Sequence, residues 1–270
     1  MSALHLTAGW SAGNVSAGVM ANGSVVSAIG DTSHRFSLAS VTKPLVAWAV
    51  LVATEEGLIG LDDEVGQPGC TLRHLLSHAG GFPFEGRSPI GPAERFRGYS
   101  NGGIEIAAEA LEHAAAMTMA HYLDEAVLRP LGMGCTALAG SPAHDAEGCV
   151  ADLLAFIAEM RSPTLVSEGT RDAAFVSTYP GLSGIVPGVG RFAPCPWGLG
   201  FEIRGDKSPH WTGHTNSPRT VGHFGGAGTM FWFDPDADVG LVALSDQPFG
   251  DWALEAWPEL SDAVLAEHTT

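Results

Sequence analysis

Four consecutive residues early in the chain have the types and the spacing of a nucleophile and its base. They are Ser40-Val41-Thr42-Lys43. A serine hydroxyl attacks a carbonyl group poorly until a neighbouring group takes its proton. Residues i and i+3 lie on one face of an α-helix, so the amine of Lys43 can reach the hydroxyl of Ser40. The segment predicts a serine nucleophile activated by lysine, although a helix cap and a surface lysine would have the same sequence.

The helix that follows favours the catalytic interpretation. A helical pattern extends from Val41 to about Glu56, and its residues 45–53 are apolar on every side, which is typical of a helix buried all round. Burial disfavours an ammonium ion and lowers the pKa of a lysine, as a lysine base requires. The chain has two lysines, Lys43 and Lys207, and solubility gives no reason to place one of them on its most apolar helix.

Two further segments carry groups that suit acyl transfer. Tyr99-Ser100-Asn101 follows a loop rich in Gly and Pro and precedes a helical pattern. A phenol can relay a proton and an amide can bind a carbonyl group, although a turn tyrosine with a capping Asn would look the same. His223 lies among the glycines of residues 222–228, just before a predicted strand. So many glycines indicate the close approach of a ligand or another backbone, or else a plain turn.

The elements around these residues are of mixed type. Five strands are predicted near the two ends of the chain, at 14–20, 24–29, 197–203, 229–233 and 239–244. Helices are predicted at 71–78, 104–116, 119–128, 150–160 and 252–267. The expected fold class is α+β, an antiparallel sheet flanked by terminal helices with an inserted all-helical lobe. The expected domains are an α/β lobe of residues 1–69 plus 171–270 and a helical lobe of residues 70–170.

Taken together, the three motifs resemble the serine β-lactamase and DD-peptidase (penicillin-binding-protein-like) superfamily, in particular its class C-like branch, which includes family VIII esterases. That family carries S-x-x-K, then Y-x-N, then K-T-G or H-x-G. The corresponding residues here are Ser40 to Lys43, Tyr99 to Asn101, and His223 to Gly225. Connecting segments at 57–64, 75–81 and 129–133 are similar too, so the resemblance covers about residues 14–250.

The resemblance implies a β-lactamase/transpeptidase-like fold and an acyl-enzyme mechanism. Ser40 would be the nucleophile, Lys43 its base, and Tyr99 a partner in proton transfer. The oxyanion would be held by the backbone N–H groups of Ser40 and Gly226. An edge strand would place His223 in the cleft. The residues expected to bind the substrate are Asn101, His223, Gly225 and Gly226.

Two departures from the family pattern bear on the substrate. Phe224 replaces the hydroxyl residue that helps β-lactamases to bind the substrate carboxylate, and His223, where many relatives have lysine, is expected to be only partly charged near neutral pH. Both changes weaken recognition of penicillins and D-alanyl peptides. The expected function is a serine esterase or amidase with weak β-lactamase activity. The alternatives are a dedicated β-lactamase or D-alanyl-D-alanine carboxypeptidase, and a catalytically idle, penicillin-binding-like binding module.

Composition narrows the expected partners. A net charge of −17 with 13 Lys and Arg residues argues against nucleic acid. No apolar run is long enough for a bilayer and no basic secretory n-region precedes Arg35, so no membrane association and a cytoplasmic location are expected. The four cysteines form no CxxC pair and are expected to be reduced thiols. A small-molecule acyl substrate is implied, with no cofactor and no metal, and the oligomeric state stays open.

Other histidines and a second serine motif offer weaker chemistry. His74 and His78 have the spacing of zinc ligands, but the glutamate of H-E-x-x-H is absent, so they are expected to hold a helix end by hydrogen bonds. His210 and His214 lie in a polar loop and are expected to face solvent or the mouth of the cleft. Residues 9–13 match the G-x-S-x-G nucleophile elbow but lack the strand that must precede it.

Overall fold

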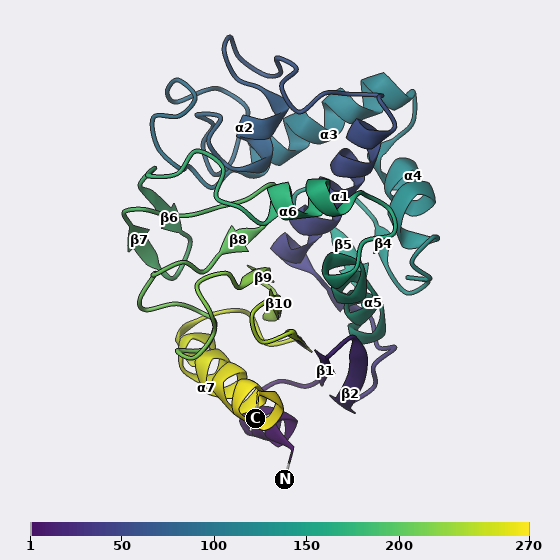
Figure 1. The fold of residues 1–270 in the computed structure, drawn as a ribbon, viewed down its shortest axis with the longest axis vertical. Coiled ribbons are helices and arrows are strands. Elements are labelled where there is room, and N and C mark those ends of the chain that lie inside the picture. Colours follow the sequence, from purple (N-terminus) through teal and green to yellow (C-terminus); the bar gives the residue numbers. More distant parts are fainter. Residues whose placement is uncertain (1, 270) are drawn as a thin grey trace.

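A six-stranded antiparallel sheet forms the centre of the computed structural model, which describes residues 2–269 (Figure 1). The strand order is β2-β1-β11-β10-β9-β8. The strands are β1 (Val15–Ala21), β2 (Ser24–Ile29), β8 (Glu202–Ile203), β9 (Val221–Gly225), β10 (Thr229–Asp234) and β11 (Val239–Ser245). Since β1 pairs with β11, the two ends of the chain build one sheet, as the expected fold class requires.

The hairpin at the start of the sheet forms as its turn chemistry predicts. Asn22 and Gly23 join β1 to β2 with φ values of 51° and 76°. Two positive φ angles are typical of the primed turn that matches the twist of a hairpin, and Asn-Gly adopts them at low cost.

Helices cover both faces of the sheet (Figure 1). The α-helices are α1 (Thr42–Glu55), α2 (Leu72–Leu76), α3 (Asn101–Ala115), α4 (Met119–Leu123), α5 (Val150–Arg161), α6 (Glu168–Ala174) and α7 (Asp251–His268). The other helical turns are η1 (Ala3–Gly9), η2 (Ala39–Val41) and η3 (Asp124–Leu128), the last of them a π-helix. Short strand pairs are formed by β3 (Phe36–Ser37), β4 (Ala137–Leu138) and β5 (Ala146–Gly148), and by β6 (Gly184–Val186) and β7 (Gly190–Phe192).

Strand β10 shows how the sheet separates two apolar clusters. Phe231 and Phe233 belong to the cluster that contains α1 and α5, whereas Met230 and Trp232 belong to the cluster that contains α7. Successive side chains of a strand point to opposite faces, so each face of β10 is apolar. Apart from the largely exposed edge strand β2, the sheet is therefore a buried layer between α5 on one side and α7 on the other.

Helix α1 lies in the interior between the sheet and the helices α3 and α4 (Figure 1). All of its residues from Thr42 to Ala53 are buried. This confirms the prediction of a helix buried on every side, and it places the segment that begins at Ser40 near the middle of the molecule.

Several predicted boundaries differ from the observed ones. Of the strand predicted at 197–203, only Glu202 and Ile203 form β8, because Gly200 adopts a φ of +87° and turns the chain. His223 was expected on an edge strand, but its strand β9 is paired with β8 over two residues, so β8 is the edge. The helix predicted at 104–116 begins three residues earlier, at Asn101.

Two other expectations concern the chain as a whole. In the part of the chain that the structure describes, no helix combines the length and the apolar character needed to cross a bilayer. Residues 3–9 form the helical turn η1, so the described residues that lead into the G-x-S-x-G match at residues 9–13 are helical and not a strand. The division into lobes of residues 1–69 plus 171–270 and residues 70–170 stays a prediction.

Candidate active site

Ser40 lies in η2, immediately before α1, where the surrounding structure fixes the backbone. The carbonyl of Leu38 accepts hydrogen bonds from Val41 N at 3.1 Å and from Thr229 Oγ1 at 2.9 Å. Ala39 has a φ of 45°, in the left-handed region that disfavours residues with a side chain. Such a conformation persists only where neighbouring contacts enforce it. The position of Ser40 is thus imposed by the sheet and by its own turn.

Gly225 allows β9 to approach η2 closely. A Cβ atom at this position would lie 2.4 Å from Leu38 O and 3.0 Å from Ala39 Cβ, so only glycine fits. The close approach expected at the glycines of residues 222–228 occurs at Gly225, and the group that approaches is the backbone at Leu38. Gly226 differs, because a Cβ there would meet nothing within 4 Å and the residue lines the pocket beside Ser40. The substrate-binding roles of both glycines stay predictions.

The amine of Lys43 is buried and makes three hydrogen bonds. Its Nζ lies 3.1 Å from Ser40 Oγ, 2.7 Å from Asn101 Oδ1 and 2.8 Å from the carbonyl oxygen of Ala143. Burial lowers the pKa of Lys43 to about 7, while the carboxylates of Glu85 and Glu105 act in the opposite direction. The amine can therefore give up its proton near neutral pH.

Tyr99 is held beside Ser40 by packing of its ring. The ring lies against His78, with centroids 4.5 Å apart, and against Trp197 at 5.7 Å. Burial raises the pKa of Tyr99 well above its usual range, although the hydroxyl of Ser40 acts in the opposite direction. The group is consequently a phenol at neutral pH, which suits a proton donor or relay better than a tyrosinate base.

His223 is neutral in this site. Its Nδ1 lies 2.7 Å from the carbonyl oxygen of Phe224, which can only accept, so we assign the ring proton to Nδ1. Its Nε2 then accepts from the hydroxyl of Tyr99, 3.5 Å away. Burial, followed by the charge of Lys43, lowers the pKa of His223 to about 3. The prediction of partial charge near neutral pH is therefore wrong, because it took no account of burial.

Asn101 connects the lysine to a loop that the sequence analysis did not single out. Its Oδ1 accepts from Lys43, and its Nδ2 donates to Glu85 Oε1 at 2.6 Å. The amide thus holds Lys43, while its predicted contact with the substrate stays a prediction. Glu85 and the Ala143 carbonyl are the site groups that sequence reasoning missed. Nothing in the sequence marks a backbone carbonyl 100 residues from Lys43 as its partner.

Four of the predicted residues line a pocket of about 250 Å³. They are Ser40, Tyr99, His223 and Gly226, whereas Lys43, Asn101 and Gly225 do not line it. The remaining walls are mostly apolar and come from Phe84, Val186, Pro187, Gly188, Trp197, Phe224 and Phe249. An apolar cavity with a few convergent polar groups is typical of a small-molecule site. The arrangement can hold an apolar acyl group with its carbonyl beside Ser40.

A second buried ionic group surrounds Glu202, which does not line the Ser40 pocket. The carboxylate accepts from Lys207 at 2.8 Å, His210 at 2.9 Å and Trp211 at 2.7 Å. Burial alone would raise the pKa of Glu202, but the charges of Lys207 and His210 outweigh it and hold the pKa well below its usual range. His210 is buried, so its expected place at the surface is wrong, whereas His214 is exposed as expected.

His74 and His78 hold loops by hydrogen bonds, as expected. His74 Nδ1 accepts from Thr71 N at 2.9 Å, and its Nε2 lies 3.0 Å from a carboxylate oxygen of Glu94. His78 Nδ1 accepts from Ser100 N at 3.2 Å, and its ring supports Tyr99. Their polar atoms have different partners, as the structural interpretation of the two histidines requires.

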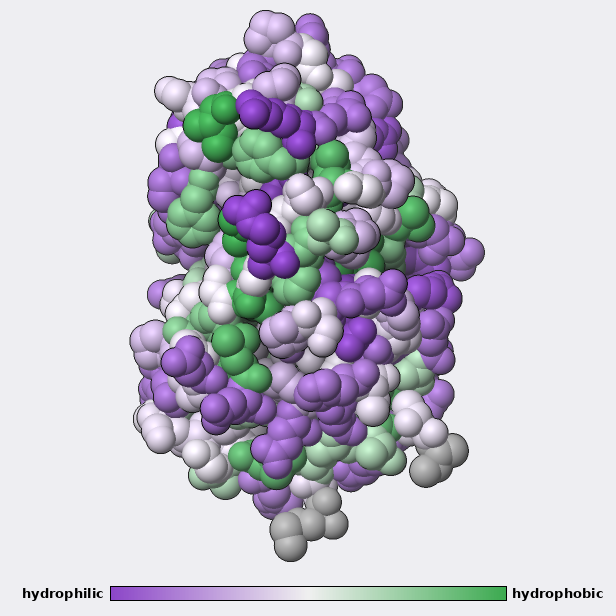
Figure 2. Space-filling view, turned by 90° about the vertical axis from the view of Figure 1, so that its left-hand side faces the viewer, coloured by the Kyte–Doolittle hydropathy of each residue, from purple (hydrophilic) through white to green (hydrophobic). Residues whose placement is uncertain are grey.

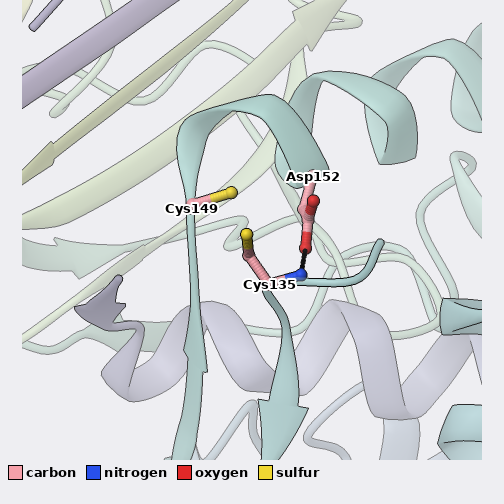
Figure 3. A group of neighbouring side chains, drawn as sticks. All are labelled: Cys135, Cys149 and Asp152. Atoms are coloured by element: carbon pink, nitrogen blue, oxygen red, sulfur yellow. Dashed lines mark hydrogen bonds between the residues drawn. The ribbon is translucent and has the colours of Figure 1, made fainter. Parts of the chain in front are cut away.

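Cys135, Cys149 and Asp152 form one further cluster, in which metal-capable atoms lie within 4.8 Å of one another (Figure 3). No other such group of three occurs among residues 2–269. Asp152 Oδ2 already accepts from Cys135 N at 2.8 Å and from Thr136 Oγ1 at 2.7 Å. Burial raises the pKa of Cys149 to about 12, so its thiol is protonated. The contacts explain the cluster as a structural one, and all four cysteines are free.

Comparisons with known proteins agree with this fold. The family model described as Beta-lactamase matches residues 5–265. Penicillin-binding protein 4* of Bacillus subtilis (strain 168) is 29% identical over an alignment 138 residues long, and the match covers 39% of this chain and 31% of that protein. The match thus spans about a third of the length of this curated relative.

Solved structures give the same result over the whole chain. A β-lactamase from Mycobacterium bovis is 46% identical, with a TM-score of 0.98 over 100% of both chains. EstCE1, a hydrolase with promiscuous acyltransferase activity, is 17% identical, with a TM-score of 0.79 over 94% of both chains, and this likeness concerns the fold alone. The expected β-lactamase/transpeptidase-like fold is confirmed, and the chain belongs to the β-lactamase family.

Proposed function

We propose that this protein is a serine hydrolase that forms an acyl-enzyme on Ser40, with esters or amides as its main substrates and β-lactams as weak ones. The observation that carries this proposal is the environment of the Lys43 amine. Its pKa of about 7 provides the neutral form at neutral pH. A small acyl compound is the substrate class that the pocket of about 250 Å³ suits.

The hydrogen bonds of Lys43 match the needs of a general base. A neutral amine has two N–H donors and one lone pair. The carbonyl of Ala143 and Asn101 Oδ1, the latter fixed in this role by Glu85, can accept the two N–H bonds. The lone pair is then left for the hydroxyl proton of Ser40, 3.1 Å away.

The proposed reaction proceeds in two balanced steps. Ser40 Oγ forms a bond to the carbonyl carbon as Lys43 takes the hydroxyl proton, and the oxyanion is held by the N–H groups of Ser40 and Gly226. The bond to the leaving group then breaks, and that group takes the proton back from Lys43 by way of the Tyr99 phenol. Water then attacks the carbonyl carbon of the acyl-enzyme through the same proton transfers, and the acid is released from Ser40.

The electrostatics near Ser40 favour esters and amides over penicillins. His223 is neutral and Phe224 is apolar, so the strand that would bind a carboxylate beside the scissile bond offers no positive charge. A dedicated β-lactamase is the second candidate, because the solved structure that is 46% identical is described as one. A D-alanyl-D-alanine carboxypeptidase would need the same carboxylate recognition.

Intact-mass and turnover measurements test the proposal. The panel is 4-nitrophenyl acetate and butyrate, nitrocefin, penicillin G and a fluorophosphonate, each with the wild type, Ser40→Ala and Lys43→Ala. Ser11→Ala is the matched control, because Ser11 is exposed and belongs to the G-x-S-x-G match. We expect adducts and ester turnover in the wild type and the control, and neither in the two site variants.

The other outcomes identify the alternatives. Faster turnover of nitrocefin than of the esters would indicate a dedicated β-lactamase. The absence of any adduct on folded wild-type protein would contradict the acyl-enzyme and indicate a binding module.

A further inference from the structure

A second apolar pocket adjoins the one that contains Ser40. It has a volume of about 430 Å³ and shares Phe84, Tyr99 and Pro187 with the Ser40 pocket. Because the same three side chains form walls of both, a ligand bound at Ser40 can extend past them into the second pocket. Further walls of this second pocket are formed by Phe82, Ile90, Phe96, Ile185 and Arg191.

Exposed hydrophobic side chains gather at this second pocket. Eight large hydrophobic residues of the described chain are exposed, and three of them, Phe84 (50%), Ile90 (56%) and Ile185 (45%), line it. Single exposed hydrophobic residues are ordinary, but a group around a hollow is typical of a binding surface. Figure 2 shows this face of the molecule, where hydrophobic residues are crossed by two long, strongly hydrophilic side chains.

Two arginines, one that lines the pocket and one close to Gly91 beside it, have no partner among residues 2–269. Of the 13 basic side chains, only those of Arg95 and Arg191 make no hydrogen bond or ion pair there. Arg191 lines the pocket. Arg95 is located by its closeness to Gly91, the neighbour of Ile90: a Cβ atom at Gly91 would lie 3.7 Å from a guanidinium nitrogen of Arg95.

The nearby acidic groups do not neutralise these arginines. Glu85 accepts a hydrogen bond from Asn101, and Glu94 contacts His74. The chain carries 30 acidic residues and a net charge of −17, so two unpaired arginines beside one apolar pocket are unusual in this molecule. They form a local positive site on a protein that otherwise repels anions.

We propose that the second pocket binds the remote part of the substrate, an apolar chain or ring that ends in a carboxylate, which Arg191 and Arg95 hold. The inference rests on the proposed function, since it describes the far half of a compound hydrolysed at Ser40. The apolar walls bind the chain, and the arginines select the charged end. Binding energy gained there, far from the reacting carbonyl, orients the scissile bond at Ser40.

Paired esters test the charged end. Mono-4-nitrophenyl suberate and 4-nitrophenyl octanoate have acyl chains of equal length and differ in the terminal carboxylate. The butyrate esters of 8-hydroxyoctanoic acid and of 1-octanol form the corresponding pair for the alcohol half. KM and kcat are measured for the wild type, Arg191→Ala and Arg191→Lys, with Arg35→Ala as the control because Arg35 is exposed and does not line the pocket.

We expect the carboxylate to lower KM in at least one pair by about three- to fivefold, as a solvent-accessible ion pair does. Arg191→Ala should remove this advantage, Arg191→Lys should keep part of it, and Arg35→Ala should leave it unchanged. A carboxylate without effect in both pairs, or an advantage that survives Arg191→Ala, would overturn the proposal.

A binding measurement tests the apolar walls without any turnover. The probe is 8-anilinonaphthalene-1-sulfonate, an apolar ring system with one anionic group, titrated by fluorescence. Ile90→Ser is compared with Val25→Ser, because the two residues are equally exposed, at 56% and 55%, and only Ile90 lines the pocket. Ile90→Ser and Arg191→Ala should each weaken binding severalfold, and Val25→Ser should not. Equal effects of the two serine variants would contradict the inference.

The same titration, set beside the activity of the wild type, separates the two proposals. Probe binding that depends on Arg191 and Ile90 in a wild-type protein that shows neither adduct nor esterase activity would refute the acyl-enzyme and retain the pocket. Esterase activity without such probe binding would refute the second pocket and retain the acyl-enzyme.

Discussion

Replacing Glu85 by glutamine tests whether Lys43 is the base. The carboxylate of Glu85 accepts from Asn101 Nδ2 at 2.6 Å, and Asn101 Oδ1 accepts from Lys43 Nζ at 2.7 Å. One amide group thus separates the two charges, a distance of roughly 7 Å from standard covalent dimensions. Glu85→Gln keeps an acceptor oxygen for Asn101 and removes only the negative charge.

The sign and size of the effect follow from this geometry. A carboxylate favours the ammonium form of Lys43, so its removal lowers the pKa of the amine below about 7. Two unit charges roughly 7 Å apart interact by roughly 2 kcal/mol at an effective dielectric constant of about 20. Glu85 is exposed, so solvent and salt reduce this to about 1 kcal/mol. The pKa of Lys43 should fall by about half a unit to one unit.

The assay is the pH dependence of kcat/KM for 4-nitrophenyl butyrate between about pH 5 and 9, which reports the ionisations of the free enzyme. The wild-type rate should rise with pH through an inflection near 7, as Lys43 loses its proton. The pKa of His223 is about 3 and that of Tyr99 is raised, so neither group supplies this inflection. Glu85→Gln should move it down by about half a unit to one unit.

Glu147→Gln is the control, because Glu147 is an exposed carboxylate on β5 that makes no contact with Lys43. Its inflection should stay at the wild-type value. An inflection in Glu85→Gln that stays in place or moves upward, in a protein with unchanged stability, would refute the assignment of the base to Lys43.

Four further substitutions have expected outcomes. Gly225→Ala should abolish fluorophosphonate labelling and lower the free energy of unfolding by about 1–3 kcal/mol in urea, because its Cβ meets backbone, whereas Gly226→Ala should leave the stability unchanged. Glu202→Gln should lower the free energy of unfolding at pH 7 by about 3–5 kcal/mol, because the buried Lys207 loses its counter-charge. His223→Ala should change the ratio of ester to nitrocefin turnover, measured as kcat/KM, and should retain acylation; total loss would contradict this division of roles.

The part of the site that local geometry determines could be predicted from the sequence. Ser40 and Lys43 are three residues apart, and the apolar residues 45–53 place them in the interior. Their 3.1 Å contact follows from the periodicity of a helix. The antiparallel sheet and its terminal helix could be predicted as well, because alternating strands and turn residues mark both ends of the chain.

The groups that complete the environment of Lys43 could not be predicted in this way. The Ala143 partner is a main-chain carbonyl, which every residue carries, and Glu85 lies in a loop without periodicity. His210 was assigned to the surface from its polar neighbours, yet the buried carboxylate of Glu202 binds it in the interior. Local composition does not reveal such contacts, because they depend on how distant segments pack.

The pairing of β1 with β11 has a consequence for synthesis of the chain. Ala17 pairs with Ala243, so the first strand leaves the ribosome 226 residues before its partner (243 − 17). At about 5–20 residues per second, this interval lasts about 10–45 s. During this interval the apolar residues 45–53 of helix α1 have no complete sheet to cover them, and a strand edge stays open to association. We therefore expect newly made chains to need the protection of a chaperone until β11 has emerged.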